Sequence, residues 1–327
     1  MSESCDISVI VPCYNANRFL NICLESLKAQ RVPNIEMIFI DDGSTDSTGA
    51  ILDAFARAES RARVVHVRNE GVSAARNRGI SMATGRYIAF MDADDVLEEN
   101  ALSILYQAAV KSGAQITSAN HTLFDVEKSC RVPVEIEPVV PQPSEIVREI
   151  IHMHRIYNNL WNKLYVRELF EDGLRLDESV HIGEDALLNL QLYLRAKNIA
   201  HISDHTYVYR VHSSSAMANM GLYSQAHQPM LQSMSAILLR EGVKELYFRD
   251  FLQSCVWVDE KEAGIMACMK RFNAYIRPLV LDGVQEDRVP QWDLRIYRAV
   301  VKGYFPQIYI LLRIREKLTG RKWGIRR

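Results

Sequence analysis

Two short apolar runs separated by a helical pattern constrain the fold of this chain more than any other feature. The first run is Ile7–Val11 and the second is Glu36–Ile40, and each ends in polar turn residues. Between them, apolar residues recur at helical spacing from Phe19 to Leu27. Strand, helix and strand in this order are typical of a parallel sheet, because parallel strands need a crossover connection. The chain is therefore predicted to begin as an α/β fold.

The same alternation continues along the first half of the chain. A helical pattern follows the second run at Ile51–Phe55, and further strands are predicted at Val64–Val67, Tyr87–Met91 and Ile116–Asn120. Repeated strand and helix units of this kind predict a doubly wound, Rossmann-like sheet.

The remainder of the chain divides into an excursion and a helical region. Arg131–Pro143 contains four prolines, which break helix and sheet alike, so a surface excursion is predicted, with regular structure resuming near Ser144. From about Gln225 onward, apolar residues fall on helical stripes. We predict one domain over residues 1–220, with two halves that meet at residue 95, and a helical C-terminal region over residues 221–327 with a basic amphipathic tail.

Charge is distributed unevenly along the chain. The formal net charge is -1, but the residues after Val301 include eight basic side chains and one acidic side chain. The body is therefore acidic, and a protein that grips a nucleic-acid backbone would instead need basic residues around its working site. We expect no nucleic-acid partner.

The cysteines and the apolar segments indicate a cytoplasmic location. The six cysteines are scattered, with no CxxC pair, which is typical of a chain in a reducing compartment. The first apolar run ends at Pro12 and is too short for a signal peptide, and no later stretch supplies the roughly 18 uninterrupted apolar residues of a membrane-spanning helix.

Polar clusters follow three of the predicted strands, at Pro12–Asn15, Asp41–Ser44 and Asp92–Asp95. Each alone could be an ordinary turn or an acidic helix start. Together they bring several carboxylates to the sheet edge where parallel strands end, and such carboxylates repel one another unless cations or hydrogen bonds offset the charge. A divalent cation takes oxygen ligands and can bridge Asp92-Ala93-Asp94 to a diphosphate. Neither a Walker loop nor a GxGxxG motif follows the first strand.

In this order, the motifs resemble those of family 2 glycosyltransferases with the GT-A fold. The matching segments are Ser8–Asn15, Ile40–Asp46, Asn69–Asn77 and Gly85–Asp95, and weaker agreement reaches about residue 213. The resemblance implies an inverting enzyme that moves a hexose or N-acetylhexosamine from a UDP-sugar to a saccharide or lipid-linked saccharide, forming a β-glycosidic bond. It further implies a role in bacterial capsule, exopolysaccharide or O-antigen synthesis.

The resemblance also implies which residues bind the nucleotide. Residues 1–95 would form the nucleotide-sugar half and residues 96–220 the acceptor half. Pro12 and Tyr14 would flank the base, Asn15 would lie in the same loop, and Asp41 would accept a hydrogen bond from the uracil imide.

A second group of residues would lie near the ribose and the diphosphate. The resemblance places Asp42 and Asp92 near the ribose and gives Asp94 to a divalent cation, Mn²⁺ or Mg²⁺. His212 would ligate the cation or touch a phosphate. Arg76 would reach the nucleotide, although an arginine on a predicted helix is also often only solvated.

Acceptor chemistry is predicted for the second half of the domain. Glu184 and Asp185 open an amphipathic helix, where acids also favour the helix dipole by about 0.3–1 kcal/mol. The resemblance makes Asp185 the general base, with Glu184 beside the acceptor. Trp161 would stack on an acceptor sugar, or would instead belong to the core with its leucine neighbours.

The C-terminal tail carries a broad apolar stripe interrupted by basic residues. Its apolar members are Phe305, Ile308, Tyr309, Leu311, Leu312, Ile314 and Leu318. This pattern is typical of an interfacial helix on an anionic membrane, with Trp323 as an anchor, and would place the chain peripherally on the inner face of the cell membrane. The stripe could instead pack on the catalytic domain or on a second subunit of a homodimer.

Two other functions compete with catalysis of glycosyl transfer. A non-catalytic nucleotide-sugar-binding subunit could share the fold, because a fold does not guarantee turnover. A sugar nucleotidyltransferase would need a glycine-rich, basic first loop, and Pro12–Asn15 is not such a loop. The intact acidic motifs favour the transferase.

Overall fold

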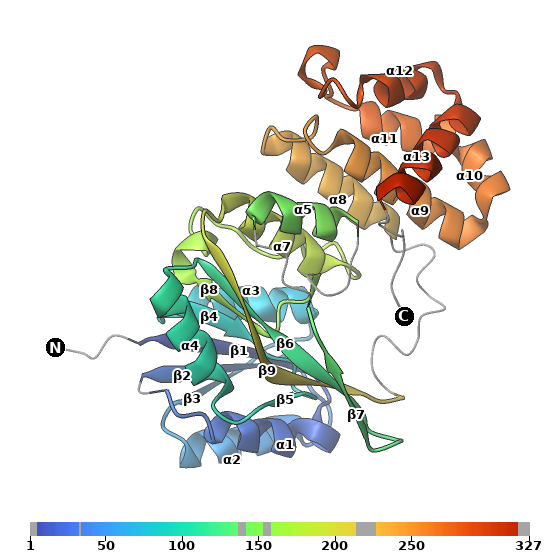
Figure 1. The fold of residues 1–327 in the computed structure, drawn as a ribbon. Coiled ribbons are helices and arrows are strands. Elements are labelled where there is room, and N and C mark those ends of the chain that lie inside the picture. The colour runs from blue at the N-terminus through green and yellow to red at the C-terminus, as the bar shows by residue number, and fades with distance from the viewer. Residues whose placement is uncertain (1–4, 33, 137–141, 153–157, 214–226, 320–327) are drawn as a thin grey trace. The chain divides into compact units, whose positions relative to one another are not determined.

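The computed structural model describes residues 5–32, 34–136, 142–152, 158–213 and 227–319 (Figure 1). The chain forms two compact units. One comprises Met1–Pro143 with Asn159–Met220, and the other comprises Ser144–Asn158 with Gly221–Arg327. The segment Ser144–Asn158 thus groups with the C-terminal helices, whereas the sequence prediction assigned it to the first domain.

The first unit is built on a sheet. Its described residues form nine strands in the order β3-β2-β1-β4-β8-β6-β9-β5, with β7 beside β6 (Figure 1). The strands are β1 (Ile7–Cys13), β2 (Ile35–Asp41), β3 (Ala62–His66), β4 (Tyr87–Phe90), β5 (Val96–Leu97), β6 (Ile116–Asp125), β7 (Cys130–Val134), β8 (Lys163–Val166) and β9 (Ile199–Val211). All five strands predicted from the sequence are present.

The sheet is parallel in its first half and mixed beyond it. β1 pairs in parallel with both β2 and β4, and β2 pairs in parallel with β3. β8 lies antiparallel between β4 and β6. The predicted doubly wound pattern therefore holds for the first four strands, and the second half departs from it because a strand from later in the chain is inserted.

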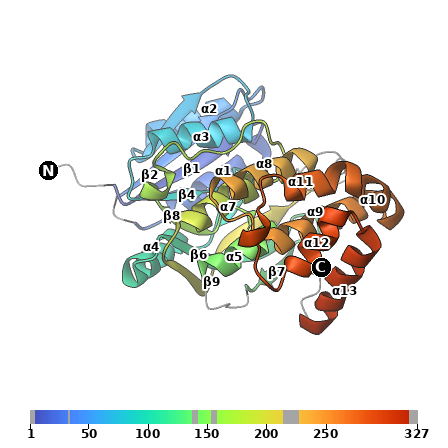
Figure 2. The same cartoon turned by 90° about the horizontal axis from the view of Figure 1, so that it is seen from above.

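Helices cover both faces of this sheet. They are α1 (Asn17–Lys28), α2 (Thr48–Ala58), α3 (Val72–Met82), α4 (Ala101–Ser112), the 3₁₀ turn η1 (Arg167–Phe170) and α7 (Glu184–Arg195). α1 buries the apolar stripe predicted for it, from Phe19 to Leu27, and each buried leucine contributes about 1.5–3 kcal/mol. α3 packs over β1 and β2 (Figure 2). A Cβ at Gly79 would lie 2.3 Å from Cγ2 of Ile10, so this close approach requires glycine.

The predicted proline-rich excursion is partly wrong. Pro133 lies within β7, paired with Thr122 of β6. Proline is tolerated there because β7 is a peripheral strand whose other side does not need a backbone donor. Pro138 and Pro141 lie outside the described residues. Regular structure resumes at α5 (Pro143–Ile151), as predicted.

The second unit is helical. It contains α5, α8 (His227–Arg240), α9 (Phe248–Ala263), α10 (Ile265–Arg271), the π-helical turn η3 (Phe272–Ile276), α11 (Arg277–Leu281), the 3₁₀ turn η4 (Glu286–Arg288), α12 (Leu294–Lys302) and α13 (Phe305–Thr319). α5 is tied to α9 because Nε2 of His152 lies 3.0 Å from Oδ1 of Asp250.

Some apolar residues of the tail are buried, and others are exposed, as at Ile310. Phe305, Ile308 and Leu312 of the predicted stripe are buried, and the ring of Phe305 lies 5.1 Å from that of Phe272. These three residues pack inside the helical unit, so this part of the stripe does not face lipid, and the membrane role of the tail stays a prediction. Trp323 lies outside the described residues. Within the described ranges, no helix combines the length and the apolar character needed to cross a membrane.

Candidate active site

The carboxyl ends of β1, β2 and β4 meet at one edge of the sheet. Cys13 pairs with Asp41 in the parallel register of β1 and β2. On the other side of β1, the backbone N–H of Met91 donates to the carbonyl of Ile10, which sets the start of the Asp92-Ala93-Asp94 motif. The three polar clusters therefore lie together, as the strand pattern predicted, whereas the roles of their members stay predictions.

Asp41 is held by two partners. Its Oδ1 accepts a hydrogen bond from the backbone N–H of Ser44 at 3.1 Å, and its Oδ2 lies 2.7 Å from Nδ1 of His66. Burial raises the pKa of Asp41, but the hydrogen bonds from Ser44 and His66 outweigh burial and hold the pKa below its ordinary value. Asp41 is therefore an ionised hydrogen-bond acceptor at neutral pH.

Asp42 fixes the loop that leads into α3. Its two carboxylate oxygens accept hydrogen bonds from the backbone N–H groups of Glu70 and Gly71, each at 2.9 Å. Asp42, which the resemblance places near the ribose, therefore stabilises the conformation of the loop at Glu70 and Gly71.

The loop after β1 presents an exposed aromatic ring. Tyr14 is 52% exposed, while the preceding Pro12 is half-buried. Asn15 adopts a left-handed backbone conformation with a φ of 47°, and its Oδ1 accepts a hydrogen bond from the N–H of Thr45 at 2.8 Å. This loop and the loop after β2 are therefore held together, and the ring of Tyr14 is free to stack on a planar ligand.

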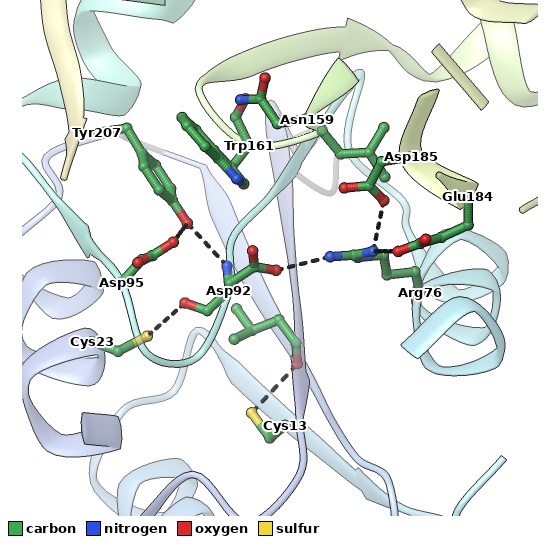
Figure 3. Close-up of polar contacts among 12 residues, drawn as sticks. Cys13, Cys23, Arg76, Asp92, Asp95, Asn159, Trp161, Glu184, Asp185 and Tyr207 are labelled. Carbon is green, nitrogen blue, oxygen red and sulfur yellow. Dashed lines mark hydrogen bonds and ion pairs between the residues drawn. The ribbon is translucent and has the colours of Figure 1, made fainter. Parts of the chain in front are cut away.

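Arg76 joins three carboxylates from two distant stretches of the sequence (Figure 3). Its Nη1 lies 2.7 Å from Oδ1 of Asp185 and 3.4 Å from Oε1 of Glu184, and its Nη2 lies 2.9 Å from Oδ1 of Asp92. The arginine is buried, and its Nε makes no hydrogen bond within the described residues. Arg76 is therefore not a solvated helix residue. Its guanidinium links the predicted base to the Asp92-Ala93-Asp94 motif.

The predicted base lies in the first turn of α7. Burial raises the pKa of Asp185 to about 7, and the nearby Arg76 opposes this rise without cancelling it. Burial likewise raises the pKa of Glu184. A carboxylate that titrates near neutral pH is suited to take a proton from a hydroxyl group.

The acidic loop after β4 is locked to β9. The backbone N–H of Asp92 donates to the hydroxyl oxygen of Tyr207 at 3.1 Å, and that hydroxyl donates to Oδ2 of Asp95 at 2.7 Å (Figure 3). The backbone N–H of Arg210 donates to Oδ1 of Asp95 at 2.7 Å. Asp95 and Tyr207 are fully buried or nearly so, and together they position the motif.

β9 also brings His212 to Asp94. Nε2 of His212 lies 3.0 Å from Oδ2 of Asp94. Burial and the neighbouring Asp92 raise the pKa of Asp94, although His212 opposes the rise. Within the described ranges, no group of three or more His, Cys, Asp and Glu side chains could hold a metal ion. The donor set of one carboxylate and one imidazole nevertheless fits a divalent cation whose other ligands come from a diphosphate.

Trp161 has aromatic neighbours on β9. Its ring stacks on Tyr207 at 4.6 Å and on Tyr209 at 5.4 Å, and it meets His121 edge to face. The side chain is half-buried. These contacts account for Trp161 as a packing residue, and its contact with an acceptor sugar stays a prediction.

The loop that carries Trp161 is held by a lysine that the sequence reasoning missed. Nζ of Lys163 donates to the carbonyl of Asn159 at 2.7 Å and to Oδ1 of Asn162 at 3.0 Å. Lys163 is 1% exposed, and burial lowers its pKa to about 7. A lysine among apolar residues in Leu160–Leu164 was the available signal. His66 and Tyr207 gave no such signal, because their partners come from other strands.

This fold is an α/β fold of the GT-A type. Residues 8–171 match the family described as "Glycosyl transferase family 2". The match covers just over half of the sequence, so the chain belongs to this family.

Curated relatives and a solved structure agree with this assignment. The chain is 34% identical over 214 residues to the uncharacterized glycosyltransferase EpsJ of Bacillus subtilis (strain 168), covering 64% of this chain and 62% of EpsJ. It is 30% identical over 267 residues to the glycosyltransferase GlyA of Streptococcus pneumoniae serotype 4, covering 72% of this chain and 38% of GlyA. It thus spans less than two thirds of either relative.

The solved structure is that of S. aureus TarS 1-349 in complex with UDP-GlcNAc. It superposes with a TM-score of 0.69 at 19% identity and covers 98% of this chain and 93% of the TarS chain. At this level of identity, the likeness concerns the fold.

Proposed function

We propose that the chain is an inverting glycosyltransferase that moves a hexose or N-acetylhexosamine from a UDP-sugar to a saccharide or lipid-linked saccharide, forming a β-glycosidic bond. The product would belong to a surface polysaccharide such as a capsule, an exopolysaccharide or an O-antigen. One observation carries the proposal: a single guanidinium contacts both Asp185 and Asp92, at 2.7 and 2.9 Å. The candidate base therefore lies one side chain away from the motif proposed to face the diphosphate.

Residues of the sheet edge would bind the donor. Tyr14 would stack on the base with Pro12 beside it, and Asp41 would accept the imide N–H of uracil as an ionised acceptor. Asp42 and Asp92 would lie near the ribose. TarS, whose fold this chain shares, is solved with UDP-GlcNAc, which fits a uridine donor.

Asp94 and His212 would hold a divalent cation, Mn²⁺ or Mg²⁺, together with oxygens of the diphosphate. Such a cation neutralises the charge that develops on the departing diphosphate. Asp94 has a raised pKa beside Asp92, so a cation there would also offset the repulsion between two carboxylates.

Asp185 would act as the general base. It would remove the proton of the acceptor hydroxyl as the hydroxyl oxygen attacks the anomeric carbon from the face opposite the diphosphate. One displacement of this kind inverts the anomeric configuration, so an α-linked donor gives a β-linked product without a covalent intermediate. We propose that residues 1–95 hold the donor and residues 96–220 the acceptor, with Glu184 and Trp161 on the acceptor side.

The inner face of the cell membrane is the location that we propose for this reaction. Because Phe305, Ile308 and Leu312 are buried, the attraction to anionic lipid would come from basic residues after Val301, each contributing about 1 kcal/mol near such a surface. Sedimentation with anionic liposomes at low and moderate salt tests this, comparing the full chain with a variant in which four of those residues, Arg321, Lys322, Arg326 and Arg327, are changed to Glu. Equal sedimentation of both proteins would remove the membrane role.

A donor panel tests the enzymatic proposal. Purified protein is incubated with UDP-, GDP- and CDP-linked sugars and a mixture of oligosaccharide acceptors, with and without Mn²⁺, and nucleoside diphosphate release is measured. We expect release from a UDP-sugar alone, dependent on Mn²⁺ and on acceptor. Release from a GDP-sugar or a CDP-sugar in preference to every UDP-sugar would refute the uridine assignment.

A further inference from the structure

His66 lies between two carboxylates at the edge of the sheet. It is the last residue of β3, and its ring is about half-exposed. Its Nδ1 lies 2.7 Å from Oδ2 of Asp41, and its Nε2 lies 3.1 Å from Oδ1 of Asp53 on α2. An ionised carboxylate only accepts hydrogen bonds, so both ring nitrogens must donate. The geometry therefore requires the protonated imidazolium.

We propose that His66 is a positioning residue for recognition of the nucleobase: as a cation it fixes Asp41 as an ionised acceptor, which selects a base with a ring N–H. This inference rests on the proposed uridine donor. Ser44 donates to the carboxylate of Asp41, with its backbone N–H directed at Oδ1. A carboxylate has about four acceptor positions in all, so we assign one that Ser44 and His66 leave to the base. Uracil offers an N–H at N3, whereas cytosine offers a lone pair there, which the carboxylate repels.

The absence of a side chain at Gly49 allows α2 to pack closely against the hydrogen-bonded pair of Asp41 and His66. A Cβ added to Gly49, in the first turn of α2, would lie 2.9 Å from Oδ2 of Asp41 and 3.4 Å from Cε1 of His66. The backbone of α2 thus closes against the hydrogen-bonded pair. The position of Asp41 is set from three sides, by Ser44, by His66 and by Gly49.

The charge on His66 depends on these same neighbours. Hydrogen bonds to Asp41 and Asp53 raise the pKa of His66 above its ordinary value. β3 is the first strand in the sheet order, and within the described residues the charged groups that face the ring are Asp41 from β2 and Asp53 from α2. As the pH rises through the pKa of His66, one of the two carboxylates loses its donor and Asp41 loses the adjacent positive charge. Binding of a uracil nucleotide should then weaken.

The test measures binding of UDP and CDP with Mg²⁺ by calorimetry between pH 6 and 8.5. His66→Leu removes the donor and the charge, and we expect UDP affinity to fall about tenfold, as for loss of a hydrogen bond to a charged group, with a smaller preference for UDP over CDP. His66→Asn keeps a donor near the Nδ1 position without a titrating group. We expect it to retain most of the affinity and to lose the pH-dependent step.

Asp53→Asn changes the residue that contacts Nε2 of His66, the ring nitrogen that does not contact Asp41. It removes one cause of the raised pKa of His66, so the pH at which UDP binding weakens should move down. Glu25→Gln is the matched control, because it neutralises an exposed carboxylate on the neighbouring helix α1. Dividing the dissociation constant of each variant by that of wild type at the same pH cancels the titration of the diphosphate.

The results separate this inference from the proposed function. Wild type that prefers CDP to UDP would overturn the uridine assignment itself. If wild type prefers UDP, two results would overturn the role of His66 alone. One is a His66→Leu variant that binds UDP as tightly as wild type. The other is an Asp53→Asn variant whose UDP binding weakens at the same pH as that of wild type. Thermal unfolding of each variant establishes that it is folded at the pH of measurement.

Discussion

Replacing Arg76 with methionine should destabilise the first unit in a way that depends on pH. The guanidinium is buried, and its two terminal nitrogens contact Asp185, Glu184 and Asp92 at 2.7, 3.4 and 2.9 Å. Methionine fills much of the same volume but leaves three carboxylates without their shared cation. Removing one partner from a buried ion pair costs about 3–5 kcal/mol, so we expect a loss of that order at pH 8.

The loss should shrink as the pH falls. Asp185 and Glu184 have folded-state pKa values above their ordinary values, so each costs stability as the pH rises from the unfolded-state pKa to the folded-state pKa. Arg76 lowers both pKa values, and its removal raises them further. Both carboxyl groups then take up protons more readily below neutral pH, and the destabilisation is smallest near pH 5.

Thermal unfolding at pH 5, 6.5 and 8 measures this effect. For a unit of this size, a loss of a few kcal/mol lowers Tm by roughly 10 °C. Arg78→Met is the control, because Arg78 lies on the same helix, is exposed and contacts only Glu70 at 3.9 Å among the described ion pairs. Two results refute the reasoning: an Arg76→Met deficit no larger than that of the control, or one of equal size at pH 5 and pH 8.

Three further predictions concern the same edge of the sheet. Asp185→Asn should lower kcat by about 10²–10⁴ with little change in UDP affinity, and wild-type kcat/KM should rise with pH through the pKa of about 7 as Asp185 ionises. Near-normal turnover would transfer the base role to Glu184. Asp94→Ala should abolish the Mn²⁺-dependent part of UDP binding in calorimetry, and unchanged binding would rule out the metal assignment. Gly49→Ala should weaken UDP binding roughly fivefold, the equivalent of about one hydrogen bond, because its Cβ would lie 2.9 Å from Oδ2 of Asp41; unaltered affinity would mean that the pair with His66 shifts without consequence.

Elements with a strong local pattern could be predicted from the sequence. β1 and β2 lie within two residues of their predicted ends, because β-branched and apolar residues followed by polar turn formers specify a buried parallel strand locally. The meeting of Asp41 with the Asp92-Ala93-Asp94 motif also follows from local patterns. Because β2 and β4 both pair in parallel with β1, the carboxyl ends of all three strands lie at the same edge of the sheet.

Features that depend on pairing between distant segments could not be predicted. The four residues of β8, Lys163–Val166, join β4 to β6, and so short a strand carries little periodicity. Pro133 was interpreted as a breaker because its place on a peripheral strand depends on which strand lies beside it. The stripe of α13 looks the same in sequence whether it faces lipid or the interior of the helical unit, and only packing around Phe305 distinguishes the two.

The Arg76 cluster shows why candidate site residues could be named from the sequence while their arrangement could not. Separate stretches of sequence predict that Arg76 reaches the nucleotide and that Asp185 acts as a base. Their partnership requires α7 to begin beside α3, 109 residues away along the chain. Because one buried cation balances the candidate base and Asp92 together, a change in charge at the proposed diphosphate side alters the environment of the base directly. We therefore expect the proposed binding of the donor and the proposed activation of the acceptor to be coupled electrostatically through Arg76.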